Sequence, residues 1–88
     1  MAHYFLHLRN GSDELLDNEG TELASLEAVR AAVLTSAREL LASDLVNGVL
    51  DLRYRIDAEN DAGELVYTLP FKQAFSVIPE DSVDARHI

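Results

Sequence analysis

The stretch Tyr4-Phe5-Leu6-His7-Leu8-Arg9-Asn10-Gly11 predicts a strand that ends in a turn. Apolar and other side chains alternate along residues 3–9, so that Tyr4, Leu6 and Leu8 share one face, the pattern of a strand with one buried side. Asn10-Gly11 is a dipeptide typical of a tight turn. We therefore expect the chain to begin with a β-hairpin.

Two registers are open for this hairpin. A two-residue turn would place Leu8 opposite Asp13, an unfavourable pair. A four-residue loop at residues 10–13 would instead place Leu8 opposite Leu15 and Arg9 opposite Glu14, which gives one apolar pair and one pair of opposite charges. We expect the longer loop for this reason.

A long helix is expected next. A turn at residues 18–20 and the segment Thr21-Glu22-Leu23 lead to Ser25, a good N-cap, and Asn47-Gly48 supplies a stop. Helical spacing gathers the apolar side chains on one face: Leu26, Val29, Val33, Ala37, Leu40 and Leu41. Arg30 falls inside this apolar arc, so we expect it to reach the edge of the helix or to pair with a carboxylate.

The most regular alternation lies at residues 50–59 and predicts a further strand. Its apolar face would hold Leu50, Leu52, Tyr54, Ile56 and Ala58. A turn that ends at Gly63 leads to a last strand, which Pro70 ends. A four-residue loop would pair Ala58 with Leu65, Ile56 with Tyr67, and Tyr54 with Leu69. Residues 71–78 would continue as a helical turn or a short strand.

Together these elements predict an α+β fold: a small antiparallel β-sheet of two hairpins, in the order ββ(β)-α-ββ, with one long α-helix packed on one face. The strand order is not determined. Residues 1–78 form the single domain, and residues 79–88 form an acidic C-terminal tail that we expect to be mobile. Since small domains often gain stability by association, we also expect a homodimer.

Composition narrows the class of protein. The 88 residues, of which 48% are hydrophobic, suit one globular domain with a modest core. The absence of cysteine excludes disulfides and thiolate metal sites. The net charge is −9 and the basic residues are dispersed, which disfavours nucleic acid as a partner. The sequence shows neither a secretory signal nor a membrane span, so we expect a soluble, cytoplasmic protein without a membrane partner.

Histidines and acidic residues near the N-terminus are the first candidates for chemistry. His3 and His7 lie four residues apart on one strand face, which separates their Cα atoms by about 13 Å, too far for adjacent ligands of one metal ion. The acidic run Asp13, Glu14, Asp17, Glu19 and Glu22 suggests a calcium or magnesium loop. Leu15 and Leu16 break the alternation of ligands that such a loop needs, so we expect no metal and no cofactor.

Two arginines form the second candidate. Arg53 and Arg55 share one face of a predicted strand and could bind a phosphate or a carboxylate. Because Asp51, Asp57 and Glu59 share that face, we expect salt bridges among these side chains instead. The face of the sheet away from the helix would remain as an interaction surface, with six candidate residues: His3, Phe5, His7, Arg53, Arg55 and Val66.

Several segments resemble one family of short bacterial proteins classed as a domain of unknown function. They are Tyr4-Phe5-Leu6-His7-Leu8-Arg9-Asn10-Gly11, Asp17-Asn18-Glu19-Gly20-Thr21-Glu22-Leu23, Leu26-Glu27-Ala28-Val29-Arg30 and Thr68-Leu69-Pro70-Phe71. The resemblance covers roughly residues 3 to 78. Members often carry an aspartate where Asn10 stands. The resemblance implies no catalytic residue, because the family has no established activity.

Two functions from different classes follow. We favour a non-enzymatic interaction or regulatory module with an unidentified protein partner. The alternative is a small metal-assisted or hydrolytic enzyme that uses His7 with Asp17 or Glu19. A structure can discriminate between the two hypotheses, because an enzyme needs these side chains to converge in a concave pocket, whereas their dispersal on a convex surface would exclude it.

Overall fold

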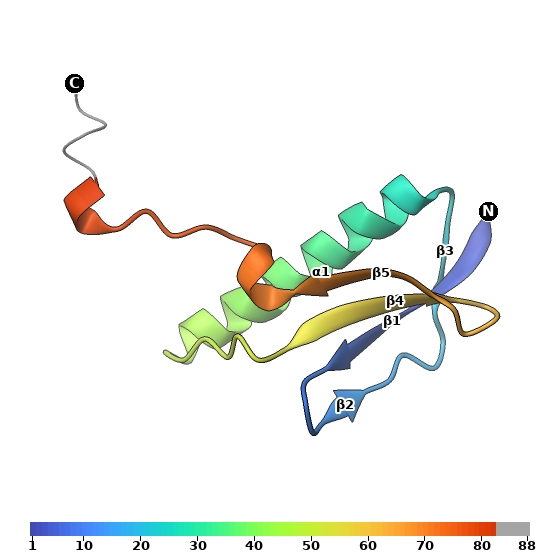
Figure 1. The fold of residues 1–88 in the computed structure, drawn as a ribbon, viewed down its shortest axis with the longest axis horizontal. Helices are drawn as coiled ribbons and strands as arrows, with labels where there is room; N and C mark the ends of the chain where they lie inside the picture. Colours follow the sequence, from blue (N-terminus) through green and yellow to red (C-terminus); the bar gives the residue numbers. More distant parts are fainter. Residues whose placement is uncertain (83–88) are drawn as a thin grey trace.

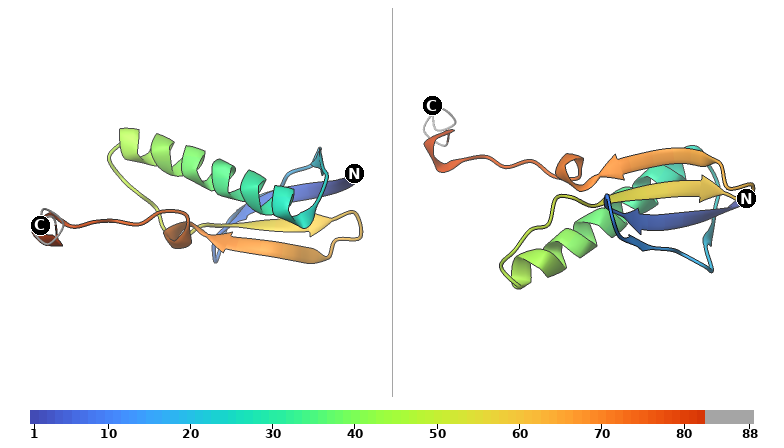
Figure 2. Two further views of the ribbon diagram at one scale, coloured as in Figure 1. Left: turned by 90° about the horizontal axis from the view of Figure 1, so that it is seen from above. Right: turned by 60° about the horizontal axis from the view of Figure 1, so that its bottom comes forward.

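The computed structural model describes residues 1–82 and has one long helix and five strands (Figure 1). The elements are β1 (Ala2–Arg9), β2 (Glu14–Leu15), β3 (Thr21–Leu23), α1 (Leu26–Val46), β4 (Arg55–Asn60) and β5 (Leu65–Pro70), followed by 3-10 turns at Phe71–Gln73 and Glu80–Ser82. The strands form one antiparallel sheet in the order β2-β1-β4-β5, and β3 also pairs with β1. Helix α1 crosses one face of this sheet (Figure 2). The predicted α+β fold is confirmed.

The first hairpin has the predicted register. Leu8 pairs with Leu15 and Arg9 pairs with Glu14 across a four-residue loop. Asn10 closes the loop, because its backbone N–H donates to the carbonyl of Asp13 at 2.9 Å and its side-chain oxygen accepts from the N–H groups of Ser12 and Asp13. The side chain of Asn10 thus stabilises the turn that the sequence predicted. The pairing of Leu8 with Leu15 determines the length of the loop.

The predicted register of the second hairpin is wrong. Ile56 pairs with Leu69 and Ala58 pairs with Tyr67, but Glu59 pairs with Leu65, so that Val66 is an extra residue in β5. The turn at Asn60 fixes this end of the hairpin, because Asn60 exchanges backbone and side-chain hydrogen bonds with Glu64. Without the extra residue, Thr68 would face the core opposite Ile56. The β-bulge at Val66 restores the match of apolar faces.

Strand β4 begins at Arg55, five residues later than the alternation predicts. Strands β1 and β5, which flank β4, end at Arg9 and Pro70, and both of these residues pair with Arg55. Residues 50–54 therefore extend past both neighbouring strands and have no strand to pair with. Asp51 forms a local turn instead, in which its carboxylate accepts from the N–H of Arg53 at 3.1 Å. Leu50 and Leu52 are consequently 39% and 42% exposed.

The core lies between one stripe of α1, strands β4 and β5, and the chain that follows β5. Its buried members are Val29, Val33, Ala37, Leu41, Ile56, Ala58, Leu69, Phe71 and Ala74. Leu26 and Leu40, which the helical spacing also assigned to the buried face, are 43% and 40% exposed, since they lie at its margins. Arg30 places its guanidinium over the ring of Tyr67, 5.5 Å from the centroid, so a cation–π contact takes the place of the expected carboxylate.

Helix α1 begins and ends where the sequence predicts. Ser25 is the N-cap and its hydroxyl accepts from the N–H of Ala28 at 3.1 Å, while Asn47 is the C-cap. We expect Ser25→Ala to lower the free energy of unfolding by about 1 kcal/mol, because one helical N–H loses its acceptor. Urea denaturation followed by circular dichroism measures this loss. Ser43→Ala, on the exposed surface of the same helix, is the control, and an equal loss in both variants would contradict the capping role.

The chain beyond β5 leaves the body of the domain. Of residues 71–78, for which a helical turn or a short strand was predicted, Phe71–Gln73 form a 3-10 turn with Phe71 buried, and residues 75–78 are neither helix nor strand. Of the predicted C-terminal tail, residues 83–88 lie outside the described residues. In the part of the chain that is described, α1 and the other helical segments are too short or too polar to cross a membrane.

Candidate functional site

The sheet face that lies away from α1 carries a connected set of polar side chains. Because side chains alternate along a strand, the odd-numbered residues of β1 and β4 project from this face, while the even-numbered ones pack towards the helix. His7 lies directly opposite Asp57, Phe5 opposite Glu59, and Arg9 opposite Arg55. The face therefore brings two of the sequence candidates, His7 and Arg55, next to carboxylates.

Arg9 lies at the centre of this polar face. Its Nη1 donates to Asp57 at 2.9 Å and to Glu59 at 3.1 Å, and its Nε donates to Glu14 at 2.9 Å. Hydrogen bonds to Asp57 and Glu14 raise the pKa of Arg9 above its usual range, so the guanidinium stays charged. The ion pair between Arg9 and Glu14 that the register predicted is present. Arg9 thereby joins β1, β2 and β4.

Asp57 is the most enclosed carboxylate of the polar face, with 7% of its side chain exposed. It accepts from Arg9, from Nε of Arg55 at 3.1 and 3.2 Å, and from the hydroxyl of Thr68. Burial alone would raise the pKa of Asp57, but the hydrogen bonds from Thr68 and Arg9 and the charge of Arg55 together lower it below its usual range. Asp57 therefore remains ionised and fully bonded.

The two arginines of the second candidate bind separate partners. Arg53 precedes β4 and makes two hydrogen bonds to Asp51, at 2.9 and 2.8 Å, which lower the pKa of Asp51 to about 2. Arg55 binds Asp57. The expected salt bridges are confirmed. Because each arginine has its own aspartate, the two do not form one binding site for an anion.

His7 is a structural link between strands. Its ring is 10% exposed, and its Nδ1 accepts from the backbone N–H of Asp17 at 3.1 Å. Nδ1 therefore carries no proton, and the proton of the neutral ring lies on Nε2, which faces Glu59 at 3.3 Å. Packing and this hydrogen bond thus fix the position of the His7 ring between β1 and the loop after β2.

The histidine–carboxylate pair of the enzyme hypothesis is not assembled among the described residues. One carboxylate oxygen of Asp17 accepts from the N–H of Leu6 at 3.1 Å, and the other accepts from the N–H groups of Glu19 and Gly20. Burial raises the pKa of Asp17, but these backbone donors, with Gly20 first, and the nearby His7 lower it below its usual range. His7 thus binds the backbone N–H of Asp17, whereas the carboxylate of Asp17 binds backbone N–H groups of β1 and of the loop.

His3 holds the other end of the same loop. Its Nε2 lies 2.7 Å from the carbonyl oxygen of Glu19, a hydrogen bond that raises the pKa of His3. Gly20 follows with φ +70°, and a Cβ atom there would lie 2.6 Å from Nε2 of His3 and 2.7 Å from the carbonyl oxygen of Tyr4. The two histidines and Gly20 therefore fix the loop that connects β2 to β3.

The six residues of the predicted interaction surface are only in part neighbours. His3, Phe5 and His7 form a row of rings on β1, with centroids 5.1 and 6.3 Å apart. Arg55 lies on the same face, beside Asp57, whereas Arg53 lies in the turn before β4. Val66 is displaced by the β-bulge and packs against the core, so it does not share the face of Phe5 as expected.

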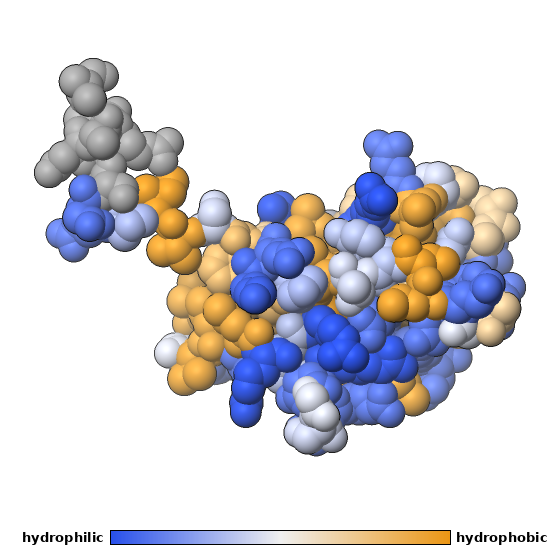
Figure 3. Space-filling view, in the orientation of Figure 1, coloured by the Kyte–Doolittle hydropathy of each residue, from blue (hydrophilic) through white to orange (hydrophobic). Residues whose placement is uncertain are grey.

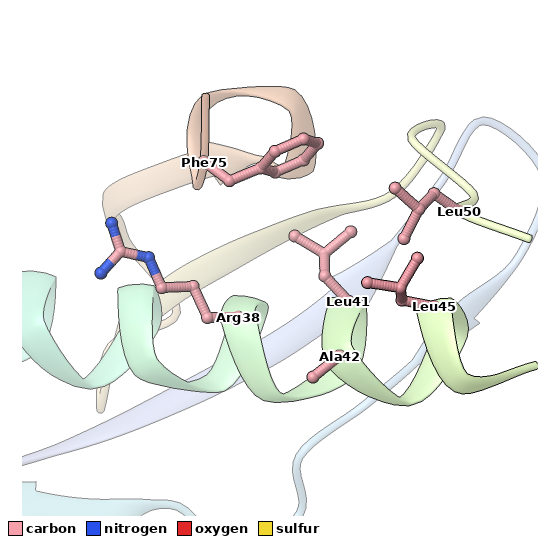
Figure 4. A pocket seen from close by; sticks show the side chains of 6 residues that line it. All are labelled: Arg38, Leu41, Ala42, Leu45, Leu50 and Phe75. Carbon is pink, nitrogen blue, oxygen red and sulfur yellow. The ribbon is translucent and has the colours of Figure 1, made fainter. Parts of the chain in front are cut away.

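An apolar groove at the other side of the domain was missed by the sequence reasoning. It has a volume of about 250 Å³ and lies between the C-terminal half of α1, the loop before β4 and the chain after β5; its lining residues are Arg38, Leu41, Ala42, Leu45, Leu50 and Phe75. Figure 4 shows Phe75 above the helix, with Leu45 and Leu50 together at one end of the groove and Arg38 at the other. We call it the Phe75 groove.

Exposed aliphatic side chains lie in the Phe75 groove, at the end of α1 and on the chain that leaves the domain. Leu45, which lines the groove, is 65% exposed. Four further residues are between 56% and 86% exposed: Val46, Val49, Val77 and Ile78. In Figure 3 hydrophobic surface gathers where α1 ends and the C-terminal segment departs. The signal in the sequence was an excess of aliphatic residues at 45–52, beyond what the buried helix face needs.

Metal ligands do not gather in the described part of the chain. No group of three or more histidine, aspartate or glutamate side chains is placed there to hold an ion. The acidic residues that suggested a cation loop serve other purposes, since Asp17 binds backbone N–H groups and Glu14 binds Arg9.

Comparison with known proteins gives one result. A family model, described as a domain of unknown function (DUF6894), matches residues 3–72. The match covers the whole sheet and α1 and ends within the 3-10 turn after β5. No curated protein and no solved structure matches the chain.

Proposed function

Since this chain belongs to the DUF6894 family, a domain of unknown function, we propose its role from its surface: it is a non-enzymatic interaction module that binds another protein chain at the Phe75 groove. The observation that carries the proposal is that this apolar groove is open to solvent, with two of its lining residues, Leu45 and Leu50, 65% and 39% exposed. Contiguous apolar surface is costly to leave in water, and on a stable domain it marks a site that another molecule covers.

The polar face supports an interaction module over the enzyme that uses His7 with Asp17 or Glu19. Its charged groups already form hydrogen bonds within the chain: Arg9 binds three carboxylates, and Asp57 binds two arginines and a threonine. In the described residues, every buried side-chain nitrogen and oxygen has a hydrogen-bond partner. Catalysis needs a group that is free to exchange a proton or to attack a substrate, and both ring nitrogens of His7 face groups of this chain, which supports the interaction module.

The dimensions of the Phe75 groove also favour a protein partner. Pockets for small molecules usually measure about 300–1,000 Å³ and carry a few convergent polar groups. The Phe75 groove is smaller, and Arg38 is the one polar residue among those that line it. Aliphatic or aromatic side chains of another chain are suitable occupants, and neither a cofactor nor a nucleic acid is part of this proposal.

A photoreactive benzoyl-phenylalanine at position 45 tests the proposal in the native host. We expect irradiation to give a discrete covalent adduct, because Leu45 lines the groove and is 65% exposed. The matched control carries the same probe at Leu65, which is 58% exposed but lies at the start of β5. Adducts are detected by immunoblotting and identified by mass spectrometry. No adduct from position 45, or equal labelling from both positions, would contradict the proposal.

A further inference from the structure

The segment after the second hairpin exposes two aliphatic side chains. Val77 is 73% exposed and Ile78 is 56% exposed, although Phe75, two and three residues earlier, packs against the core. The views in Figures 1 and 2 agree that this segment runs away from the sheet and from α1. We call residues 76–79 the arm.

The base of the arm is fixed. Ala74 is 1% exposed, and its carbonyl oxygen accepts a hydrogen bond of 2.7 Å from Nε of Arg38. At the other end, Pro79 restricts Ile78 to an extended backbone and donates no N–H of its own. The arm therefore starts from a fixed point beside the groove that Phe75 and Arg38 line, and its last residue before Pro79 is already extended.

From these features we propose that two copies of this chain exchange arms, so that Val77 and Ile78 of each copy fill the Phe75 groove of the other. The inference rests on the proposed function and identifies the partner as a second copy of this chain. The groove is lined by apolar side chains, the arm exposes two apolar side chains, and both lie at the same end of the folded domain. Two copies related by a two-fold axis can bury both surfaces at once, because the arm of each copy binds in the groove of the other.

Charge determines how this association responds to salt. Each copy carries a net charge of −9, so two copies repel one another. Salt screens this repulsion, while the burial of Val77 and Ile78 is apolar. The dimer is therefore stronger at high ionic strength. A basic protein partner in the same groove would show the opposite dependence, because salt would weaken its attraction to the acidic domain.

The first test is the mass of the unmodified protein. Size-exclusion chromatography with light scattering should give twice the 9.7 kDa of one chain at micromolar concentrations and above, with more dimer as salt increases. Ile78→Asp should raise the dimer dissociation constant roughly tenfold or more, because it places a charge in an apolar groove. The control is Leu15→Asp, at a site that is 70% exposed on β2, which should leave the constant unchanged. A mass of one chain at all concentrations overturns the proposal.

Engineered cysteines test the geometry directly, since the natural chain has none. A mixture of the single variants Leu45→Cys and Ile78→Cys should form a disulfide between two chains under mild oxidation. The control mixture of Leu15→Cys and Ile78→Cys should not. The double variant with cysteines at 45 and 78 separates the two ways to fill the groove, because arm exchange gives a covalent dimer and an arm that folds back gives a bridged monomer. A bridged monomer, or no disulfide above the control, overturns arm exchange.

Failure of arm exchange can be distinguished from failure of the proposed function. If the protein is a monomer but position 45 is labelled by a different protein in the host, the groove binds another chain and only the exchange of arms is wrong. If position 45 gives no adduct of any mass, the proposed function itself falls.

Discussion

Gly20→Ala should lower the free energy of unfolding by about 3 kcal/mol or more. Gly20 has φ +70°, a conformation that costs an L-residue about 1–2 kcal/mol. Its added Cβ would also meet Nε2 of His3 at 2.6 Å and the backbone oxygen of Tyr4 at 2.7 Å. Because the second contact is to backbone, β1 itself must shift. Urea denaturation at equilibrium, followed by circular dichroism, measures the loss.

Gly63→Ala is the matched control for this substitution. Gly63 has φ +77°, almost the same backbone conformation, but a Cβ atom there would have no heavy atom within 4 Å. Its variant should therefore lose the backbone contribution alone, about 1–2 kcal/mol. The difference between the two variants isolates the cost of the close approach between Gly20 and β1. Equal losses would show that the loop at residues 17–20 is not held against β1 as described.

Asp57→Asn should have the second largest effect, a loss of about 2–4 kcal/mol. The substitution keeps the shape of the side chain but removes the charge that Arg9 and Arg55 share. It also turns one acceptor into a donor that faces these guanidinium groups. The site is enclosed, with 7% of the Asp57 side chain exposed, so water cannot replace the lost bonds.

Asp51→Asn is the control, because Asp51 also accepts two hydrogen bonds from the guanidinium of an arginine, besides one from its backbone N–H. Its partner Arg53 is 79% exposed, and exposed ion pairs contribute little to stability. Guanidinium chloride screens charges, so urea is the better denaturant for both variants. A similar loss in the two variants would show that the polar face of the sheet does not stabilise the fold.

The pH dependence of the free energy of unfolding gives a second measure of how much Asp57 stabilises the fold. The pKa of Asp57 in the folded chain lies below its usual value of about 3.9. Its contribution is therefore fully present above that usual pKa and is lost as the pH falls through the lower, folded pKa. Asp17 acts in the same direction. Unfolding in urea between about pH 7 and pH 3 should show a shallower loss for Asp57→Asn than for the natural chain; parallel curves would contradict this origin.

Much of the fold followed from local patterns because those patterns agreed with one another. In the first hairpin, the pairing of Leu8 with Leu15 and of Arg9 with Glu14 selected one register, and the structure has it. In the helix, Ser25 and Asn47 marked both ends. These features depend on neighbours in the sequence or on one pair of strands, which periodicity can represent.

What the sequence could not predict depends on partners distant in the chain. The start of β4 is set by where β1 and β5 end, and the bulge at Val66 is set by the Asn60 turn. The polar face was predicted as a set of residue types, but the joining of Arg9 to Asp57 and Glu59 needs the pairing of β1 with β4, which the pattern left open. The Phe75 groove needs three separate segments at once.

The loop that Asp17 anchors also decides how the sheet can grow. Strands β2 and β3 cover the same edge of β1, at its two ends, and between them the carboxylate of Asp17 occupies the N–H of Leu6. The opposite edge, β5, has its regular spacing interrupted at Val66 and ends in Pro70, which has no N–H to offer. The outer edge of β5 pairs with no strand among the described residues, but the bulge and Pro70 interrupt the regular run of backbone groups that it could offer to an incoming strand. Growth of the sheet is therefore disfavoured at both of its edges.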